Sequence, residues 1–142
     1  MSFLSAISKP VAAFTAWQLK RDSLHAEAAQ QRIFEQLIKR AKNTAFGQDH
    51  HFSSIYSYDD FKKQVPVRDY EALKPYVIRI RNGESDVLWP GKPLYLSKTS
   101  GTTSGVKYIP ITSESMPNHI SSARNAILCY IAETRNADFL NG

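Results

Sequence analysis

The sequence predicts an α/β fold with a mainly helical first half, followed by a strand, a loop, a second strand and a helix. Three observations predict it. Apolar residues recur at helical spacing through most of residues 3–82. Two short apolar and aromatic runs, 94–96 and 108–111, flank a segment rich in Ser, Thr and Gly. A second helical pattern follows that segment.

The first expected helix covers residues 3–20, and the Lys9–Pro10 step places a start or a kink near residue 10. A second helix is expected over about 22–43. Its buried stripe should consist of Ile33, Phe34, Leu37, Ile38 and Ala41. The first helix should pack against the second, with a membrane surface as the alternative, through Ile7, Val11, Phe14 and Trp17.

Two shorter helices are expected next. Ser57 can cap the first of them through a capping-box-like start, and Pro66 ends it. Asp69 can cap the other, which we expect to be interrupted at Pro75 and closed by Asn82–Gly83. A turn is expected at Trp89–Gly91.

The two strands are expected at Leu94–Leu96 and Tyr108–Ile111, and Pro110 restricts the second to an edge or a bulge. Thr112 or Ser113 should cap the last helix, with Glu114 in its first turn. Its buried positions should be Ile120, Ala123, Ile127, Leu128 and Ile131. Cys129 is expected to be a small core residue of this helix.

The segment between the strands, residues 98–107, has the composition of a loop that wraps a phosphate. Gly101 and Gly105 allow positive φ angles and a close approach of the backbone, so successive N–H groups can form an anion-binding concavity. Lys107 can supply a compact positive charge. The hydroxyl donors are Thr99, Ser100, Thr102 and Thr103, with Ser104 as a fifth candidate.

This loop is not a Walker A motif, because three residues rather than four separate its glycines and Lys107 follows Val106. A kinase-like or P-loop nucleotide hydrolase is therefore not expected. A flexible Ser/Thr/Gly linker is the structural alternative, and the strand-like flanks argue against it.

Residues 99–107 resemble the phosphate loop of the adenylate-forming enzymes, whose pattern is [ST]-S-G-T-T-G-x-P-K-G. Three positions depart from that pattern, namely Ser104, Val106 and Tyr108. These departures, and the continuation through Lys107 and Ile109–Pro110, are similar to the Gretchen-Hagen-type acyl acid amido synthetases, the auxin-conjugating family and its bacterial relatives. The matching positions are Thr99, Ser100, Gly101, Thr102, Thr103 and Lys107.

The upstream half resembles the same family, so the resemblance spans about residues 24–120. The short motifs that match the family occur in the family's order and at similar spacing. They are Thr44–Gly47, Asp60–Phe61, Val65–Pro66, Asp69–Glu71, Pro75–Tyr76 and Gly83–Glu84.

The resemblance implies the N-terminal portion of an adenylate-forming fold, with a helical region at 1–92 and the start of an ATP-binding α/β subdomain at 93–142. It implies a ligase that uses ATP and Mg²⁺ to adenylate a carboxylic acid, which is then conjugated to an amine or amino acid. The expected catalytic residue is Lys107, near the leaving pyrophosphate or bracing the loop. The expected ATP-binding residues are Thr99, Ser100, Gly101, Thr102, Thr103, Ser104 and Gly105.

The family is several times longer than these 142 residues. No aromatic-x-x-[ST]-Glu segment follows the loop, and in the family such a segment helps to hold nucleotide and Mg²⁺. We therefore expect an N-terminal fragment that is inactive alone, with the protein ligands of the metal beyond residue 142. The alternative function is a non-catalytic helical interaction module with an incidental anion-binding loop.

Composition narrows the classes of partner. The net charge is +5, but the basic residues are dispersed, so nucleic-acid binding is not expected. The single cysteine excludes an intrachain disulfide, and the adjacent His50 and His51 cannot share one face of a regular element as metal ligands. With no apolar run long enough for a membrane span and no signal-peptide pattern, we expect a cytoplasmic protein.

Overall fold

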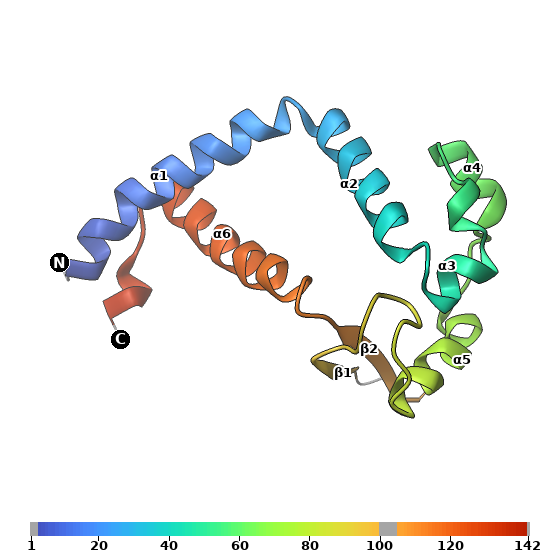
Figure 1. Ribbon diagram of the computed structural model, residues 1–142. Coiled ribbons are helices and arrows are strands. Elements are labelled where there is room, and N and C mark those ends of the chain that lie inside the picture. The colour runs from blue at the N-terminus through green and yellow to red at the C-terminus, as the bar shows by residue number, and fades with distance from the viewer. Residues whose placement is uncertain (1–2, 100–104, 142) are drawn as a thin grey trace. The chain divides into compact units, whose positions relative to one another are not determined.

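A computed structural model describes residues 3–99 and 105–141 of the chain. It is mostly helical and contains a small two-stranded antiparallel sheet within that part, in agreement with the predicted α/β class (Figure 1). In chain order the elements are α1 (Phe3–Ser23), α2 (Ala26–Ala41), α3 (Ala45–Asp49), the 3-10 helix η1 (Phe52–Ser54), α4 (Tyr58–Gln64), α5 (Tyr70–Arg81), β1 (Tyr95–Thr99), β2 (Lys107–Ile111), α6 (Met116–Thr134) and the 3-10 helix η2 (Asp138–Asn141).

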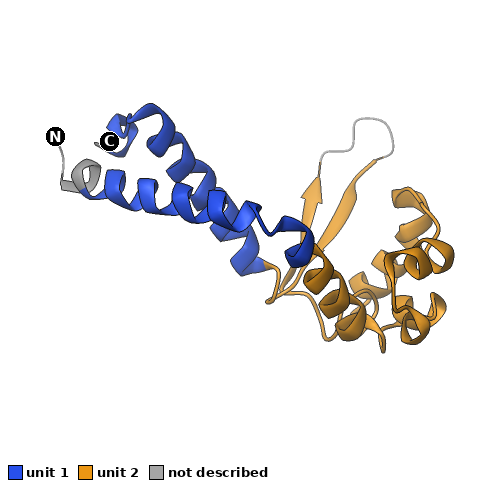
Figure 2. Ribbon diagram, turned by 90° about the horizontal axis from the view of Figure 1, so that it is seen from above, with its two compact units in different colours: residues 1–29, 116–142 blue, residues 30–115 orange. Residues whose placement is uncertain are grey.

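The chain forms two compact units (Figure 2). One consists of residues 1–29 and 116–142, and the other of residues 30–115. The expected division into a helical region at 1–92 and the start of an α/β subdomain at 93–142 is a different kind of boundary from these two units, and it stays a prediction. None of the helices in the described part of the chain combines the length and the apolar content that crossing a bilayer requires.

In the first unit, α1 packs against α6. The inner side of α1 carries small residues, with Ala12 fully buried and Ser8, Thr15 and Ala16 half-buried. On the other side of the contact, Ile131 and Ala137 are buried, with Leu128, Ala132 and Leu140 packed around them. Small side chains allow two helix axes to approach closely, which explains why this face of α1 packs against α6.

The expected burial of the large apolar stripe of α1 against the second helix is therefore wrong. The four residues of that stripe are between 46% and 61% exposed, and they are Ile7, Val11, Phe14 and Trp17. Phe14 and Trp17 pack on each other instead, with ring centroids 5.9 Å apart, and the Arg21 guanidinium lies 5.1 Å from the Trp17 ring.

The boundary between the first two helices also differs from the prediction. Helix α1 begins at Phe3 and continues through Pro10, so the proline does not start it. It ends at Ser23, whose hydroxyl donates to the carbonyl of Lys20 at 2.7 Å. A turn at Leu24–His25 then precedes α2, later than the expected start at residue 22. One missing N–H does not stop a helix whose turns on both sides are bonded.

The core of the second unit lies between α2 and the short helices that follow. Its buried residues are Ile38, Ala41, Phe52 and Ile55. Half-buried apolar residues pack around them, namely Phe34, Phe46, Phe61, Val65 and Trp89. The buried stripe of α2 is narrower than predicted, because Ile33 and Leu37 are 51% and 50% exposed.

The predicted caps are present in the second unit. The Ser57 hydroxyl accepts the backbone N–H of Asp60 at 3.1 Å, and the Asp69 carboxylate accepts that of Ala72 at 3.0 Å. Helix α5 closes at Asn82, and Gly83 follows with a φ of 90°. The expected interruption at Pro75 is wrong, because α5 continues through it.

The turn at Trp89–Gly91 is held by Asp86. The backbone N–H of Asp86 donates to the carbonyl of Gly91 at 3.0 Å, and the Asp86 carboxylate accepts the N–H of Gly91 at 2.8 Å. The same segment binds the start of α3, since Ala45 and Phe46 donate to the carbonyls of Asp86 and Val87. This segment therefore leads from α5 to the hairpin in a fixed conformation.

The start of α6 differs from the prediction. Ser115 and Thr112 form reciprocal hydrogen bonds between backbone N–H groups and hydroxyls, at 3.0 and 3.1 Å, and the helix begins only at Met116. Glu114 therefore lies before the first turn rather than in it. Of the expected buried stripe of α6, only Ile131 is fully buried, and Cys129 is half-buried rather than a core residue.

Candidate active site

The loop singled out in the sequence is the connection of a β-hairpin. Strands β1 and β2 are antiparallel, and Thr99 pairs with Lys107 as the last pair before the connection. The predicted strands are confirmed, and each extends further toward the loop than expected. The described part of the predicted site consists of Thr99, Gly105 and Lys107. The remaining predicted residues lie outside the described residues, namely Ser100, Gly101, Thr102, Thr103 and Ser104.

Thr99 and Lys107 lie on one face of the hairpin. Residues directly opposite each other in an antiparallel pair carry side chains on the same side, with Cβ atoms about 5 Å apart. Both residues are half-buried. The hairpin therefore presents one hydroxyl donor and one ammonium together at the start of the loop.

Gly105 lies in the backbone conformation that the sequence predicted for a loop glycine. Its φ is 78°, a backbone angle that residues other than glycine rarely adopt. A Cβ placed there would meet nothing within 4 Å. The requirement for glycine at this position therefore comes from the backbone rather than from lack of space.

Tyr70, the first residue of α5, contacts β2 in two ways. Its hydroxyl accepts the backbone N–H of Tyr108 at 2.8 Å. The face of its ring lies 5.6 Å from the ammonium of Lys107, measured from Nζ to the ring centroid. Both distances are typical of a hydrogen bond and of a cation–π contact.

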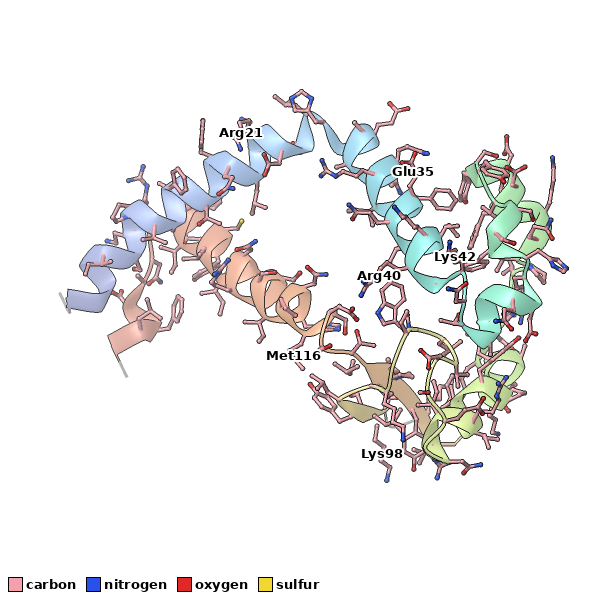
Figure 3. All side chains as sticks on the ribbon, viewed as in Figure 1. Arg21, Glu35, Arg40, Lys42, Lys98 and Met116 are labelled. Carbon is pink, nitrogen blue, oxygen red and sulfur yellow. The ribbon has the colours of Figure 1, made fainter. Side chains whose placement is uncertain are left out.

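A second cation–π contact joins the other end of α5 to the same strand. The guanidinium of Arg81 lies 4.3 Å from the centroid of the Tyr108 ring. Lys98 is the register partner of Tyr108 and carries its side chain on that face of the hairpin (labelled in Figure 3). Arg81 and Lys98 thus lie at the face of the hairpin that carries Tyr108, whereas Lys107 lies on the opposite face, beside Thr99.

The sequence did not assign roles to Tyr70 and Arg81. Tyr70 belongs to the Asp69–Glu71 motif, but its contact with Tyr108 spans 38 residues of the chain. No local pattern indicates a contact over that distance.

Three carboxylates of the second unit have structural partners. Glu71 pairs with Lys74 at 2.9 Å, and the Arg79 guanidinium hydrogen bond holds the pKa of Glu84 below its usual value. The backbone N–H of Gly91 lowers the pKa of Asp86. Within residues 3–99 and 105–141, no three His, Cys, Asp or Glu side chains are grouped so that they could hold a metal ion.

His50 belongs to an aromatic cluster in the second unit. Its ring stacks on Phe46 with centroids 4.1 Å apart, and its Nδ1 lies 2.8 Å from the Phe46 carbonyl. Its Nε2 lies 2.7 Å from the Arg68 guanidinium. Arg68 can only donate, so Nε2 accepts, and the imidazole is neutral with its proton on Nδ1. Burial raises the pKa of the neighbouring Tyr76, whose hydroxyl donates to Asp49.

The comparisons with known proteins agree on one family. Residues 16–139 match the GH3 family N-terminal domain. The chain is 45% identical over 64 residues to the indole-3-acetic acid-amido synthetase GH3.15 of Arabidopsis thaliana, which covers 44% of this chain and 11% of that protein. It is 33% identical over 113 residues to the probable indole-3-acetic acid-amido synthetase GH3.7 of Oryza sativa subsp. japonica, which covers 70% of this chain and 18% of that protein.

A third relative shows the same relation. The indole-3-acetic acid-amido synthetase GH3.17 of Arabidopsis thaliana is 32% identical over 95 residues, which is 65% of this chain and 16% of that protein. The chain therefore spans less than a fifth of the length of these three relatives.

Proposed function

This chain belongs to the GH3 family, and from that membership we propose that it forms the N-terminal part of an ATP-dependent acyl acid amido synthetase. Three relatives carry amido synthetase names, although the matched segments cover only 11–18% of them. The observation that supports the proposal most directly is the position of Lys107 opposite Thr99, in the last pair of residues before the Ser/Thr/Gly loop that connects the two strands.

The residues at the hairpin fit the phosphates of ATP. Lys107 supplies positive charge, and the ion pairs among the described residues leave it without a carboxylate partner. Gly105 has the positive φ that an anion-binding turn requires. Bound ATP would supply the adenylyl group that activates the carboxylic acid, with pyrophosphate as the leaving group.

In this proposal the Lys107 ammonium stabilises the negative charge of the phosphates, and the Thr99 hydroxyl donates a hydrogen bond to a phosphate oxygen from the same face of the hairpin. The remaining proposed ATP-binding residues are Ser100, Gly101, Thr102, Thr103, Ser104 and Gly105. Charge stabilisation and positioning of this kind account for most of the catalysis of phosphoryl chemistry.

Mg²⁺ enters the proposal with ATP rather than through a protein site in this chain. The described residues offer no cluster of carboxylates for it. A magnesium ion on nucleotide phosphates keeps several waters and needs only one or two carboxylates. We therefore propose that its protein ligand lies in the part of the enzyme that these residues do not include.

The proposed substrates are a small carboxylic acid and an amine or amino acid, and the proposed location is cytoplasmic. The competing possibility, a non-catalytic interaction module, would leave ATP unused. Carboxylate-dependent exchange of pyrophosphate into ATP separates the two. We expect exchange from a protein that carries these residues followed by the further length of its relatives. Absence of exchange with every acid tested, in a folded protein, would contradict the proposal.

A further inference from the structure

We propose that Tyr70 is a positioning residue for Lys107, an inference that rests on the proposed role of Lys107 toward the phosphates of ATP. Tyr70 is placed by the start of α5, where the Asp69 carboxylate caps the helix. From there its hydroxyl reaches the backbone of β2, and its ring reaches the side chain of Lys107. One side chain thus fixes both the strand and the ammonium.

The hydroxyl of Tyr70 completes the outer edge of β2. Because N–H groups two residues apart in a strand point to the same side, those of positions 108 and 110 face the same edge. Tyr108 donates to Tyr70, and Pro110 has no N–H. The edge therefore carries no unsatisfied donor at either position, and the strand is tied to α5 immediately beside Lys107.

The ring of Tyr70 holds the ammonium without neutralising it. A lysine side chain has four rotatable bonds and loses considerable freedom when it is fixed. A carboxylate could fix it, but the pair would then compete with an anionic ligand. No described carboxylate pairs with Lys107. An aromatic face attracts the charge and leaves the three N–H donors available to phosphate oxygens.

Two variants separate the contributions of the hydroxyl and the ring. Tyr70→Phe removes the hydroxyl and keeps the ring, whereas Tyr70→Leu removes both. Tyr56 is 82% exposed, so Tyr56→Phe and Tyr56→Leu are matched controls. The measurements are NMR order parameters of the Lys107 side chain and hydrogen exchange of the Tyr108 amide, in the 142-residue chain.

We expect Tyr70→Phe to speed exchange of the Tyr108 amide about 3- to 10-fold, as the loss of one hydrogen bond does, while Lys107 stays ordered. Tyr70→Leu should speed that exchange as well and also lower the order parameter of Lys107. The Tyr56 controls should change neither. Equal order of Lys107 in the wild type and in folded Tyr70→Leu would overturn the inference.

Should Tyr70→Leu fail to fold, the wild type and Tyr70→Phe still decide the question. A nuclear Overhauser contact between the Lys107 ε-methylene and the ring at position 70 is expected in both, and its absence would overturn the inference. Titration with ATP and Mg²⁺ tests the proposed function separately. If the Lys107 signals do not respond while the contact with Tyr70 is present, the proposed role of Lys107 fails and the contact does not.

Discussion

The indole N–H of Trp89 donates to the Glu114 carboxylate at 2.6 Å, which joins the segment before the hairpin to the segment after it. Arg40 of α2, which is labelled in Figure 3, pairs with the same carboxylate. Glu114 was expected to interact with the dipole of α6. Its position before the helix instead places it against Trp89, where one carboxylate serves two donors from different elements.

We expect Glu114→Ala to destabilise the second unit by about 1 kcal/mol more than Glu114→Gln does, because only the alanine variant leaves the half-buried indole N–H without an acceptor. The ion pair should contribute little, since the side chains of Arg40 and Glu114 are 57% and 46% exposed. Urea unfolding followed by the fluorescence of Trp89, in a Trp17→Phe background, measures the difference. If Arg40→Ala costs as much as Glu114→Ala, the ion pair and not the indole contact is the important interaction.

Gly47 should be intolerant of any side chain. It is buried in α3, and a Cβ there would overlap the backbone carbonyl oxygen of Ala41, which a rotamer change cannot relieve. We expect Gly47→Ala to cost about 1–3 kcal/mol or more in the free energy of unfolding, the usual range for overpacking. The adjacent exposed variant Gln48→Ala should stay within about 0.5 kcal/mol of the wild type. Circular dichroism during urea unfolding checks both, and a neutral Gly47→Ala would show that this contact is not as close as described.

Stability should depend on pH through the Arg79–Glu84 pair. The guanidinium hydrogen bond lowers the pKa of Glu84, so the folded state favours the charged carboxylate. The contribution of the pair is then fully present above the unfolded carboxyl pKa, roughly 4.3, and is lost as the pH falls through the lower folded value. We expect the melting temperatures of the wild type and Glu84→Gln to differ at pH 7 and to converge near about pH 2–3.

The control for this prediction is Glu133→Gln, which changes an exposed carboxylate on α6. Its melting temperature should follow that of the wild type at every pH. A difference for Glu84→Gln that stays constant down to acid pH would mean that the residue acts through packing rather than through its charge.

Local signals were sufficient for much of the second unit. The cap at Asp69 and the exit at Asn82–Gly83 depend on neighbouring residues alone, and α5 has the predicted ends. The C-terminus of α5 is a Schellman motif: the backbone N–H of Gly83 donates to the carbonyl of Ile80, and that of Glu84 donates to the carbonyl of Arg79. The strands beside the loop were likewise predictable from short apolar runs.

Contacts between distant segments were not predictable. The face of α1 that is buried is decided by α6, more than 90 residues away, and the small residues around Ala12 give a weaker sequence signal than the stripe through Phe14. The partner of Lys107 is equally remote, since Tyr70 reaches it from another helix. The composition of the loop identified the candidate site, whereas the residues that position its lysine required the tertiary structure.

The 142 residues alone should show no carboxylate-dependent exchange of pyrophosphate into ATP. They span less than a fifth of the relatives named above, and the described residues contain no carboxylate cluster for Mg²⁺. Radiolabelled pyrophosphate, with a longer family member as the positive control, provides the assay. Exchange well above the blank that Lys107→Ala abolishes would show that these residues are a sufficient enzyme.

In a protein with the further length of its relatives, Lys107→Ala should act mainly on the ATP-dependent half-reaction. Lys98→Ala is the matched control, because it removes a cation from the other face of the same hairpin. Thr102→Ala should slow adenylation roughly 10- to 100-fold, since a hydrogen bond to a charged group contributes about 1.5–3 kcal/mol. Ser104→Gly, which restores the residue of the adenylate-forming pattern, should have a milder effect.

Separate measurement of pyrophosphate release and of amide formation decides where Lys107 acts. If it holds the phosphates, a preformed acyl adenylate bypasses the step that needs it, so Lys107→Ala should form the amide from that compound at a rate close to that of the wild type. Loss of amide formation from the preformed compound would place Lys107 in the second half-reaction. Wild-type rates of pyrophosphate release in folded Lys107→Ala and Thr102→Ala would mean that the loop does not bind ATP, and the assignment of this hairpin as the nucleotide site would be wrong.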